Sequence, residues 1–217
     1  THPAAGSASA PGESCAHPTR VTRDPAAPAR RLFFALWPDE TQRLELEHSC
    51  AKAVRHSGGR PVPVSNLHVT LAFLGSVAAA RLPDLHRIAR EQAARHAHDA
   101  PATLTFARLA HWKEAQILCA LAGEQSPSAR GLAVALQEAA AALGLSPDRK
   151  PFQAHVTLAR KVVRPGALLA LRPVVWRFDA FALIDSRTEP SGPVYSVIDS
   201  YPLISTDKAR DQERNAP

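Results

Sequence analysis

The hydrophobic and polar positions of this chain follow two different periods, which predicts a mixture of strands and helices from about residue 31 onward. Short apolar or alternating runs are typical of strands, whereas apolar residues that recur every three or four positions are typical of amphipathic helices. Gly and Pro residues separate most of these segments. The expected strands cover residues 32–37, 67–74, 103–109, 116–122, 153–161, 176–184 and 194–204, and the expected helices cover residues 40–56, 81–97 and 126–143.

Expected strands follow one another in pairs too often for a regular series of parallel crossovers. The order therefore predicts an α+β fold in two lobes of similar plan, with mainly antiparallel sheets and helices packed outside them. Residues 1–30 are rich in Ala, Pro, Ser, Gly and Arg without a hydrophobic period, which is typical of a disordered extension. Residues 31–205 are expected to form the folded part, and residues 206–217 a loose charged tail.

Composition limits the class of protein without identifying it. Hydrophobic residues make up 45% of the 217 residues, which is enough for a sizeable core. No apolar run reaches the roughly 18 residues of a membrane span and no secretory signal is visible, so we expect a cytoplasmic protein with no membrane partner. The three Cys residues lack the spacing of a disulfide framework or a zinc cluster. The formal net charge of +6 favours a polyanionic partner.

One five-residue phrase, His-Val-Thr-Leu-Ala, occurs twice, at residues 68–72 and 155–159. In each copy the His and the Thr are two places apart, and this period places both side chains on one face of a strand. A single such pair in a strand is usually structural. Two identical copies at similar points of the two halves instead predict that two imidazole and hydroxyl pairs face each other across a cleft.

These pairs, His68 with Thr70 and His155 with Thr157, suit acid–base chemistry on a phosphoester. Because the unperturbed imidazole pKa is about 6.5, one ring can accept a proton from water while the other protonates the departing oxygen. The Thr hydroxyls would bind the non-bridging oxygens of the phosphate. This chemistry needs no metal or cofactor. A zinc site is the weaker interpretation, since nothing acidic lies beside either copy.

Arg160 and Phe34 are two further candidates for substrate binding. Arg160 follows the second copy and would add a fixed positive charge at the phosphate. It lies five places beyond His155, so it reaches the cleft only if the strand twists or ends there. Phe34 is a candidate for stacking on a nucleobase, although a core position is the competing interpretation.

The two His-x-Thr-x tetrads resemble the signature of the two-histidine phosphoesterase superfamily. Nearby segments resemble the LigT-like RNA 2′,3′-cyclic phosphodiesterases, also described as 2′-5′ RNA ligases, over about residues 30–205. The matching segments are residues 31–36, 71–75, 152–155, 158–160, 183–186 and 201–203. Ala154 and Asp185 stand where the family more often has Pro and Glu.

This resemblance implies a bilobal, pseudo-twofold fold with an active-site cleft between the lobes. It also implies that a cofactor-free enzyme, expected to be a monomer, hydrolyses the terminal 2′,3′-cyclic phosphate of RNA to a 2′-phosphate, with reversible 2′-5′ ligation. By the same resemblance, His68 is the proton donor and His155 the proton acceptor. Two alternatives stay open: a non-catalytic nucleotide- or RNA-binding module of the same fold, and a phosphodiesterase for small cyclic nucleotides or 2′-5′ oligoadenylate.

Overall fold

The structure, a computed structural model, describes residues 29–97, 101–123, 126–147, 150–163, 165, 171–190 and 192–203. The first strand begins at Ala29, two residues before the expected start of the folded part. The rest of the expected N-terminal extension and the expected tail at residues 206–217 lie outside the described residues. Within these ranges no helix is both long enough and apolar enough to span a bilayer.

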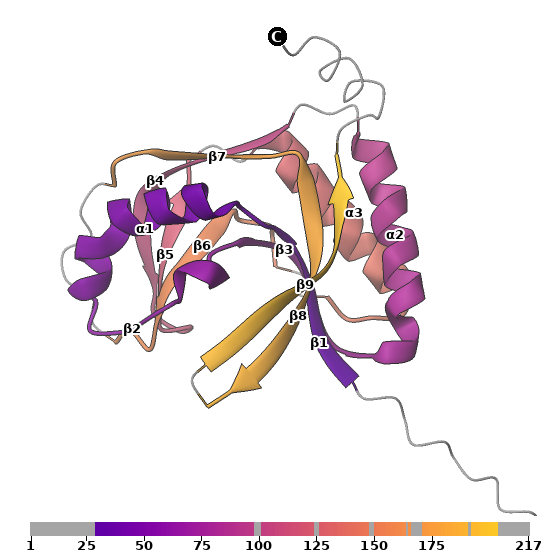
Figure 1. Cartoon of the computed structure of the whole chain (residues 1–217), viewed down its shortest axis with the longest axis horizontal. Coiled ribbons are helices and arrows are strands. Elements are labelled where there is room, and N and C mark those ends of the chain that lie inside the picture. Colours follow the sequence, from indigo (N-terminus) through magenta and orange to yellow (C-terminus); the bar gives the residue numbers. More distant parts are fainter. Residues whose placement is uncertain are drawn as a thin grey trace, which may run out of the picture.

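Two sheets, whose strands all pair antiparallel, form the framework of the two lobes (Figure 1). The first sheet runs in the order β3 (Val69–Ala78), β1 (Ala29–Leu36), β8 (Ala180–Glu189) and β9 (Gly192–Pro202). The second runs in the order β2 (Arg60–Pro61), β6 (His155–Arg160), β5 (Ile117–Ala122), β4 (Ala102–Trp112) and β7 (Val174–Phe178). The expected α+β class with mainly antiparallel sheets is confirmed.

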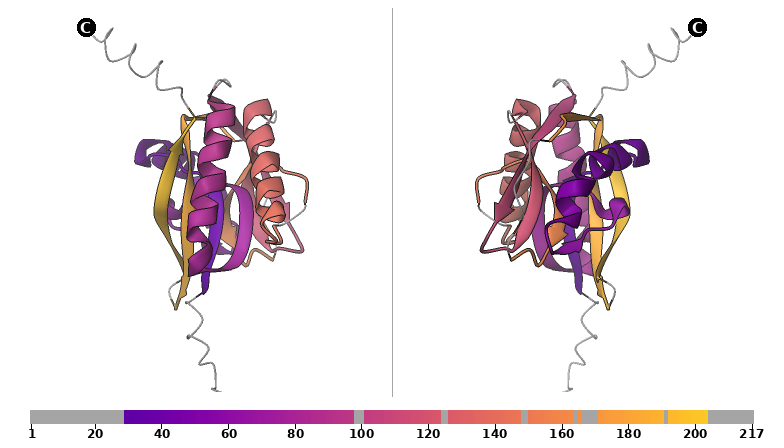
Figure 2. Two further views of the ribbon diagram at one scale, coloured as in Figure 1. Left: turned by 90° about the vertical axis from the view of Figure 1, so that its right-hand side faces the viewer. Right: turned by 90° about the vertical axis from the view of Figure 1, so that its left-hand side faces the viewer.

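In the described part of the chain, three α-helices pack against these sheets. Helix α1 (Glu40–Arg55) lies against β6 and β7 of the second sheet, although it follows a strand of the first. Helix α3 (Pro127–Ala142) follows β5 of the second sheet and packs on β3 of the first, beside α2 (Leu82–His96), as Figure 2 shows. Helices α1 and α3 thus each follow a strand of one sheet and pack on the other, which ties the two lobes together.

Helices α1 and α3 begin where a side chain accepts a hydrogen bond from one of their first backbone N–H groups. At α1, the Asp39 carboxylate accepts from Gln42 N at 2.8 Å, and the Gln42 amide oxygen accepts from Asp39 N at 3.1 Å. Ser126 caps α3, and Pro127 occupies its first turn. Both arrangements stabilise the start of a helix, because the first N–H groups of a helix have no acceptor within the helix.

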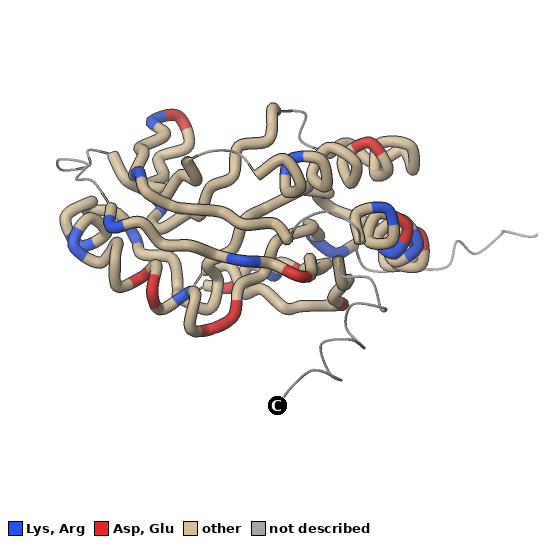
Figure 3. Tube along the Cα trace, turned by 90° about the horizontal axis from the view of Figure 1, so that it is seen from above, with Lys and Arg blue, Asp and Glu red and all other residues tan. Residues whose placement is uncertain are grey.

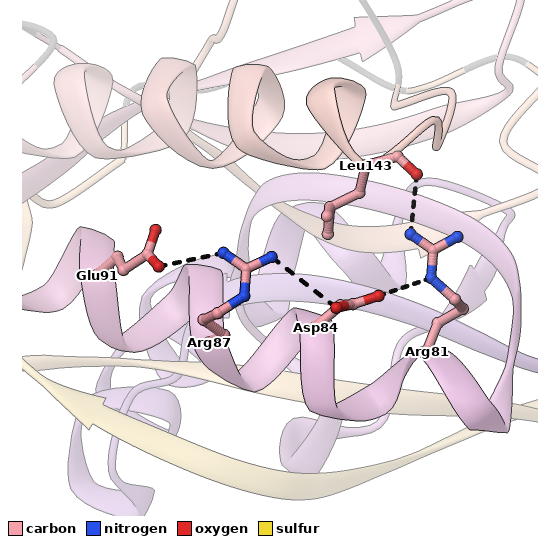
Figure 4. Close-up of polar contacts among 5 residues, drawn as sticks. All are labelled: Arg81, Asp84, Arg87, Glu91 and Leu143. Atoms are coloured by element: carbon pink, nitrogen blue, oxygen red, sulfur yellow. Dashed lines mark hydrogen bonds and ion pairs between the residues drawn. The ribbon is translucent and has the colours of Figure 1, made fainter.

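Surface charges on α2 form a chain of contacts that reaches α3. Arg87 bridges Asp84 and Glu91 at 3.8 and 3.1 Å, and Arg81 contacts Asp84 at 2.9 Å (Figure 4). Arg81 also donates to the carbonyl of Leu143 at the end of α3, 2.8 Å away. In Figure 3, where α2 is seen end-on, basic and acidic segments accordingly lie next to each other. Exposed pairs of this kind contribute little to stability, but the last contact satisfies a carbonyl at a helix C-terminus.

Two differences from the predicted strands have a clear physical reason. The expected strand at residues 176–184 is in fact two strands, since β7 and β8 are separated at Asp179 and belong to different sheets. Buried apolar side chains lie on both sides of the break, Phe178 before it and Phe181 after it, so the hydrophobic pattern gives no sign of it. Strand β3 continues through Gly75, which has a φ of +71° and lies at a register shift against β1. Glycine adopts this conformation without strain, so the strand bends there instead of ending.

Candidate active site

The two copies of the repeated phrase lie opposite each other, because β3 and β6 approach one another between the two sheets. A hollow of about 370 Å³ at this place is lined by His68, Thr70, His155 and Thr157. The structure therefore brings together all four residues of the two pairs. We call this hollow the histidine cleft.

Both imidazole rings are held in the same way. Nδ1 of His68 lies 2.7 Å from the carbonyl oxygen of Asn66, and Nδ1 of His155 lies 2.8 Å from that of Gln153. A carbonyl can only accept a hydrogen bond, so Nδ1 must carry the proton and donate. In the neutral rings Nε2 is therefore the nitrogen that can accept a proton. Nε2 of His68 lies 3.1 Å from Thr70 Oγ1, which can donate to it.

The same irregularity follows the Thr in each copy. The pairing of β3 with β1 skips Leu71, and the pairing of β6 with β5 skips Leu158, so each strand contains an extra residue there. An extra residue of this kind interrupts the strict alternation of side chains along a strand. Arg160 consequently lines the histidine cleft in spite of its odd spacing from His155.

Phe73, which occupies the position in the first copy that corresponds to Arg160, also lines the cleft. It carries no charge, but the guanidinium of Arg31 lies over its ring, 5.0 Å from the centroid. Arg31 lines the cleft as well. The first half thus obtains its cation from β1 and not from the repeated phrase, which is why the phrase alone did not point to Arg31.

The two rings differ in their surroundings. His68 lies among three aromatic rings, Phe33, Trp37 and Tyr195, with centroids 5.0, 5.6 and 5.2 Å from its own. The aromatic contact of His155 is with Trp112, whose ring centroid is 4.4 Å away. His68 is therefore the more enclosed of the two rings.

Burial lowers the pKa of both histidines, because the charged ring loses hydration. The pKa of His68 falls to about 4, chiefly through burial. The hydrogen bond to the Asn66 carbonyl opposes this shift, whereas the charges of Arg160 and Arg43, and that of His155 when it is protonated, lower the pKa further. The pKa of His155 is also lowered, with burial as its cause and the Gln153 carbonyl opposing it. Both rings are therefore neutral near pH 7 in the free protein.

Arg43 forms a second layer behind His68. Its guanidinium lies 4.6 Å from the ring centroid of Trp37, and Trp37 in turn stacks on His68. Arg43 Nε donates to the carbonyl of Leu67 at 3.1 Å, which holds the loop just before β3. The stack positions the His68 ring and brings a fixed charge close to it.

Asn66 joins two walls of the cleft that both belong to the first sheet, namely its edge strands β3 and β9. Its carbonyl accepts from His68, and its side-chain nitrogen donates to the carbonyl of Pro193 at 2.7 Å. Pro193 and Tyr195 belong to the hairpin of β8 and β9, and both line the histidine cleft. Asn66 and Gln153 stand at the same distance before the two histidines, but only the sheet arrangement shows that the Asn66 side chain contacts the opposite wall.

Phe34 does not lie in the cleft, so its predicted stacking role is wrong. The side chain is fully buried and packs edge-on against Phe181 in the core, with ring centroids 5.9 Å apart. Successive residues of β1 point to opposite faces of the sheet, so Phe33, and not Phe34, faces the cleft. The sequence shows this alternation, but it does not show which face of the strand the second lobe covers.

In the part of the chain that the structure describes, no group of three or more His, Cys, Asp or Glu side chains could hold a metal ion together.

Comparison with known proteins agrees with this architecture. The family model described as LigT like Phosphoesterase matches residues 36–117. An RNA 2′,3′-cyclic phosphodiesterase of Thermus thermophilus is 32% identical over 189 residues, which cover 80% of this chain and 90% of the relative. Another of that name, from Escherichia coli, is 34% identical over 134 residues, or 60% of this chain and 72% of the relative.

Solved structures show the same arrangement of lobes. The crystal structure of E. coli LigT complexed with 3′-AMP matches with a TM-score of 0.71 and 27% identity, covering 82% of this chain and 99% of LigT. TT0787 of T. thermophilus matches with a TM-score of 0.69 and 28% identity, covering 81% and 99%. The fold is thus that of a bilobal phosphoesterase. The chain belongs to the LigT-like phosphoesterase family.

Proposed function

We propose that this protein hydrolyses the terminal 2′,3′-cyclic phosphate of RNA to a 2′-phosphate, as a monomer and without a metal ion. The observation that carries the proposal is the pair of imidazoles in one cleft, each with Nδ1 committed to a carbonyl and Nε2 left for proton transfer. The relatives named RNA 2′,3′-cyclic phosphodiesterase support the substrate class.

The proposed reaction is a displacement at phosphorus. Nε2 of His155 takes a proton from water as the water oxygen bonds to phosphorus. The bond from phosphorus to O3′ breaks, and Nε2 of a protonated His68 gives its proton to O3′. The products are a 2′-phosphate and a free 3′-hydroxyl, and exchange with solvent returns both rings to their starting states.

The remaining groups of the cleft would bind the phosphate. The hydroxyls of Thr70 and Thr157, which line the cleft, would donate to its non-bridging oxygens, whose negative charge grows as water attacks. Arg160 and Arg31 supply positive charge from opposite lobes. Donors that are held in position before the substrate arrives stabilise this charge without reorganisation.

The division of labour follows from family resemblance, and the geometry also supports the reverse. In the free protein His68 is unfavourable as a cation, because it is buried and lies near the guanidinium groups of Arg160 and Arg43. The proposed assignment requires the bound phosphate anion to raise the pKa of His68 enough to protonate it. The alternative is that His155 donates the proton and His68 accepts one from water.

A substrate with a good leaving group separates these two assignments. In a nucleoside 3′-O-methyl 2′-(p-nitrophenyl phosphate), the p-nitrophenolate takes the place of O3′ as leaving group and needs no proton, so loss of the general acid costs little. We expect His68→Ala to keep near wild-type rates on this ester, while His155→Ala remains strongly impaired. The opposite result would exchange the two roles. Equal and severe loss in both variants would contradict a simple acid and base pair.

The activity itself is tested with an RNA oligomer that ends in a 2′,3′-cyclic phosphate, incubated with a chelator. A 2′-phosphate product, identified by its resistance to a 3′-specific phosphatase, is the expected result. Tight binding without hydrolysis would favour the non-catalytic module. Turnover of a small cyclic nucleotide or 2′-5′ oligoadenylate but not of the oligomer would favour the small-substrate alternative.

The same cleft would also catalyse attack on the cyclic phosphate by a ribose hydroxyl in place of water. If the 5′-hydroxyl of a second RNA attacks the cyclic phosphate and the bond to O3′ breaks, the product is a 2′-5′ linkage. Because water is present at about 55 M, hydrolysis should dominate unless the second RNA is held in place. Formation of a nuclease-resistant 2′-5′ joint from two RNA halves would measure this activity.

A further inference from the structure

A larger hollow opens directly from the histidine cleft toward β2. It encloses about 640 Å³ and shares His68, Thr157, Arg160, Gly192, Pro193 and Tyr195 with the cleft. We call it the β2 pocket, and the lining residues that it does not share include Arg60, Pro61, Val62, Pro63 and Lys161. Any group attached to a phosphate held between the histidines can therefore extend into this pocket.

The β2 pocket is positively charged and lacks counter-charges of its own. Arg60, Arg160 and Lys161 line it, whereas none of its lining residues is Asp or Glu. Within the described ranges none of these three side chains forms an ion pair. Arg60 and Arg160 also stand directly opposite each other in the pairing of β2 with β6. Like charges in this arrangement repel each other, so an anion bound between them would relieve an unfavourable contact.

The backbone holds these cations close together. Val62 N donates to the carbonyl of Leu158 at 2.8 Å, which fastens β2 to β6. A Cβ at Gly59 would lie 2.7 Å from the carbonyl oxygen of Arg160, so only glycine allows β2 to approach this closely. Lys161 has a φ of +58°, a left-handed conformation that is costly for a lysine.

We propose that Arg60 and Lys161 bind the phosphodiester that precedes the terminal nucleotide of an RNA chain, so that the β2 pocket selects a polynucleotide over a mononucleotide. This inference rests on the proposed function, because the phosphate between the histidines anchors the chain. Arg160 is shared with the histidine cleft and accompanies the reacting phosphate, which leaves Arg60 and Lys161 for a second anion. The Pro and Val side chains of the pocket offer apolar surface to the nucleoside between the two phosphates.

Two substrates and one double variant test the proposal. We expect Arg60→Gln combined with Lys161→Gln to lower kcat/KM on a single-stranded RNA oligomer with a 2′,3′-cyclic phosphate end by about 10- to 100-fold, mainly through KM. Turnover of adenosine 2′,3′-cyclic phosphate, which lacks the second phosphate, should change less than twofold. Arg95→Gln combined with Arg130→Gln is the matched control, since it removes the same charge from exposed positions on α2 and α3.

The outcomes separate this inference from the proposed function. Equal losses on both substrates, or no loss on the oligomer, would overturn the inference while the function stands. If the wild type cleaves neither substrate, the proposed function fails, and binding of the oligomer still decides the inference. The slope of log affinity against log salt concentration should then decrease in magnitude by about 0.7 in the double variant, because one neutralised single-strand phosphate contributes about 0.7. An unchanged slope would refute the second phosphate contact.

Discussion

The two halves of the histidine cleft share one backbone plan and differ in what surrounds it. Both provide a His whose Nδ1 bonds the carbonyl two residues earlier, a Thr, and an extra residue after the Thr. The first half encloses its His in aromatic rings and takes its cation from a different strand, whereas the second carries Arg160 in the strand itself. Repetition thus supplies the reacting groups, and the unrepeated neighbours make them unequal.

The largest expected effect is one that the two halves share. We expect His68→Ala and His155→Ala each to lower kcat on the cyclic phosphate end of RNA by about 10²- to 10⁴-fold, because each removes one proton transfer. Single-turnover assays with the proteins in excess measure this. His48→Ala, at an exposed position on α1, is the control and should leave the rate unchanged. If a variant at either cleft histidine keeps a tenth of the activity, the prediction that both rings transfer a proton is contradicted.

Arg160 and Arg31 should differ in how much each contributes to kcat/KM. We expect Arg160→Ala to lower kcat/KM by about 10- to 100-fold and Arg31→Ala by less than about tenfold, because Arg31 is partly committed to the face of Phe73. Steady-state kinetics on one oligomer compares the two variants. Lysine at position 160 should recover only part of the loss, since it lacks the planar guanidinium. Equal losses at the two positions would show that the halves contact the phosphate equivalently.

The burial of His68 should also make the stability of the protein depend on pH. The pKa of His68 in the folded protein is about 4, below the unperturbed value near 6.5, so between these values the unfolded chain binds more protons. Stability should therefore fall as the pH drops from about 6.5 to about 4. The free energy of unfolding, measured with urea, should fall between pH 7 and pH 4.5. This fall should be smaller by about 2 kcal/mol in His68→Phe than in the wild type. An equal pH dependence in the two proteins would contradict the burial of His68.

The smallest expected effects concern the residues two places before each histidine. Asn66→Ala should lower stability by about 1 kcal/mol and kcat a few-fold, because the hydrogen bond to Pro193 is lost. Gln153→Ala should change stability by less than about 0.5 kcal/mol, since only the backbone carbonyl of Gln153 holds its histidine. Chemical denaturation and steady-state rates measure both. If the two substitutions have the same effect, the hydrogen bond from the Asn66 side chain to the Pro193 carbonyl does not help to hold the cleft in shape.

Much of the fold follows from local patterns that this sequence shows clearly. The capped start of α1 at Asp39, the start of α3 at Ser126 and the antiparallel strand pairs are all visible as periods and turn residues. The break at Asp179 is not visible, because buried apolar residues stand on both sides of it, Phe178 before and Phe181 after. Assignment of those strands to different sheets depends on contacts between residues far apart in the chain.

The sequence by itself determined which groups the cleft holds, since a His and a Thr at a period of two must share a strand face wherever that strand lies. Only the tertiary structure decided what surrounds them. Phe33 lines the cleft and Phe34 lies in the core because of the face that β1 turns toward the second lobe. Arg160 reaches the cleft because β6 contains an extra residue at Leu158. Burial, repulsion between cations and contact across the two walls depend on distances between strands, and local spacing does not encode those distances.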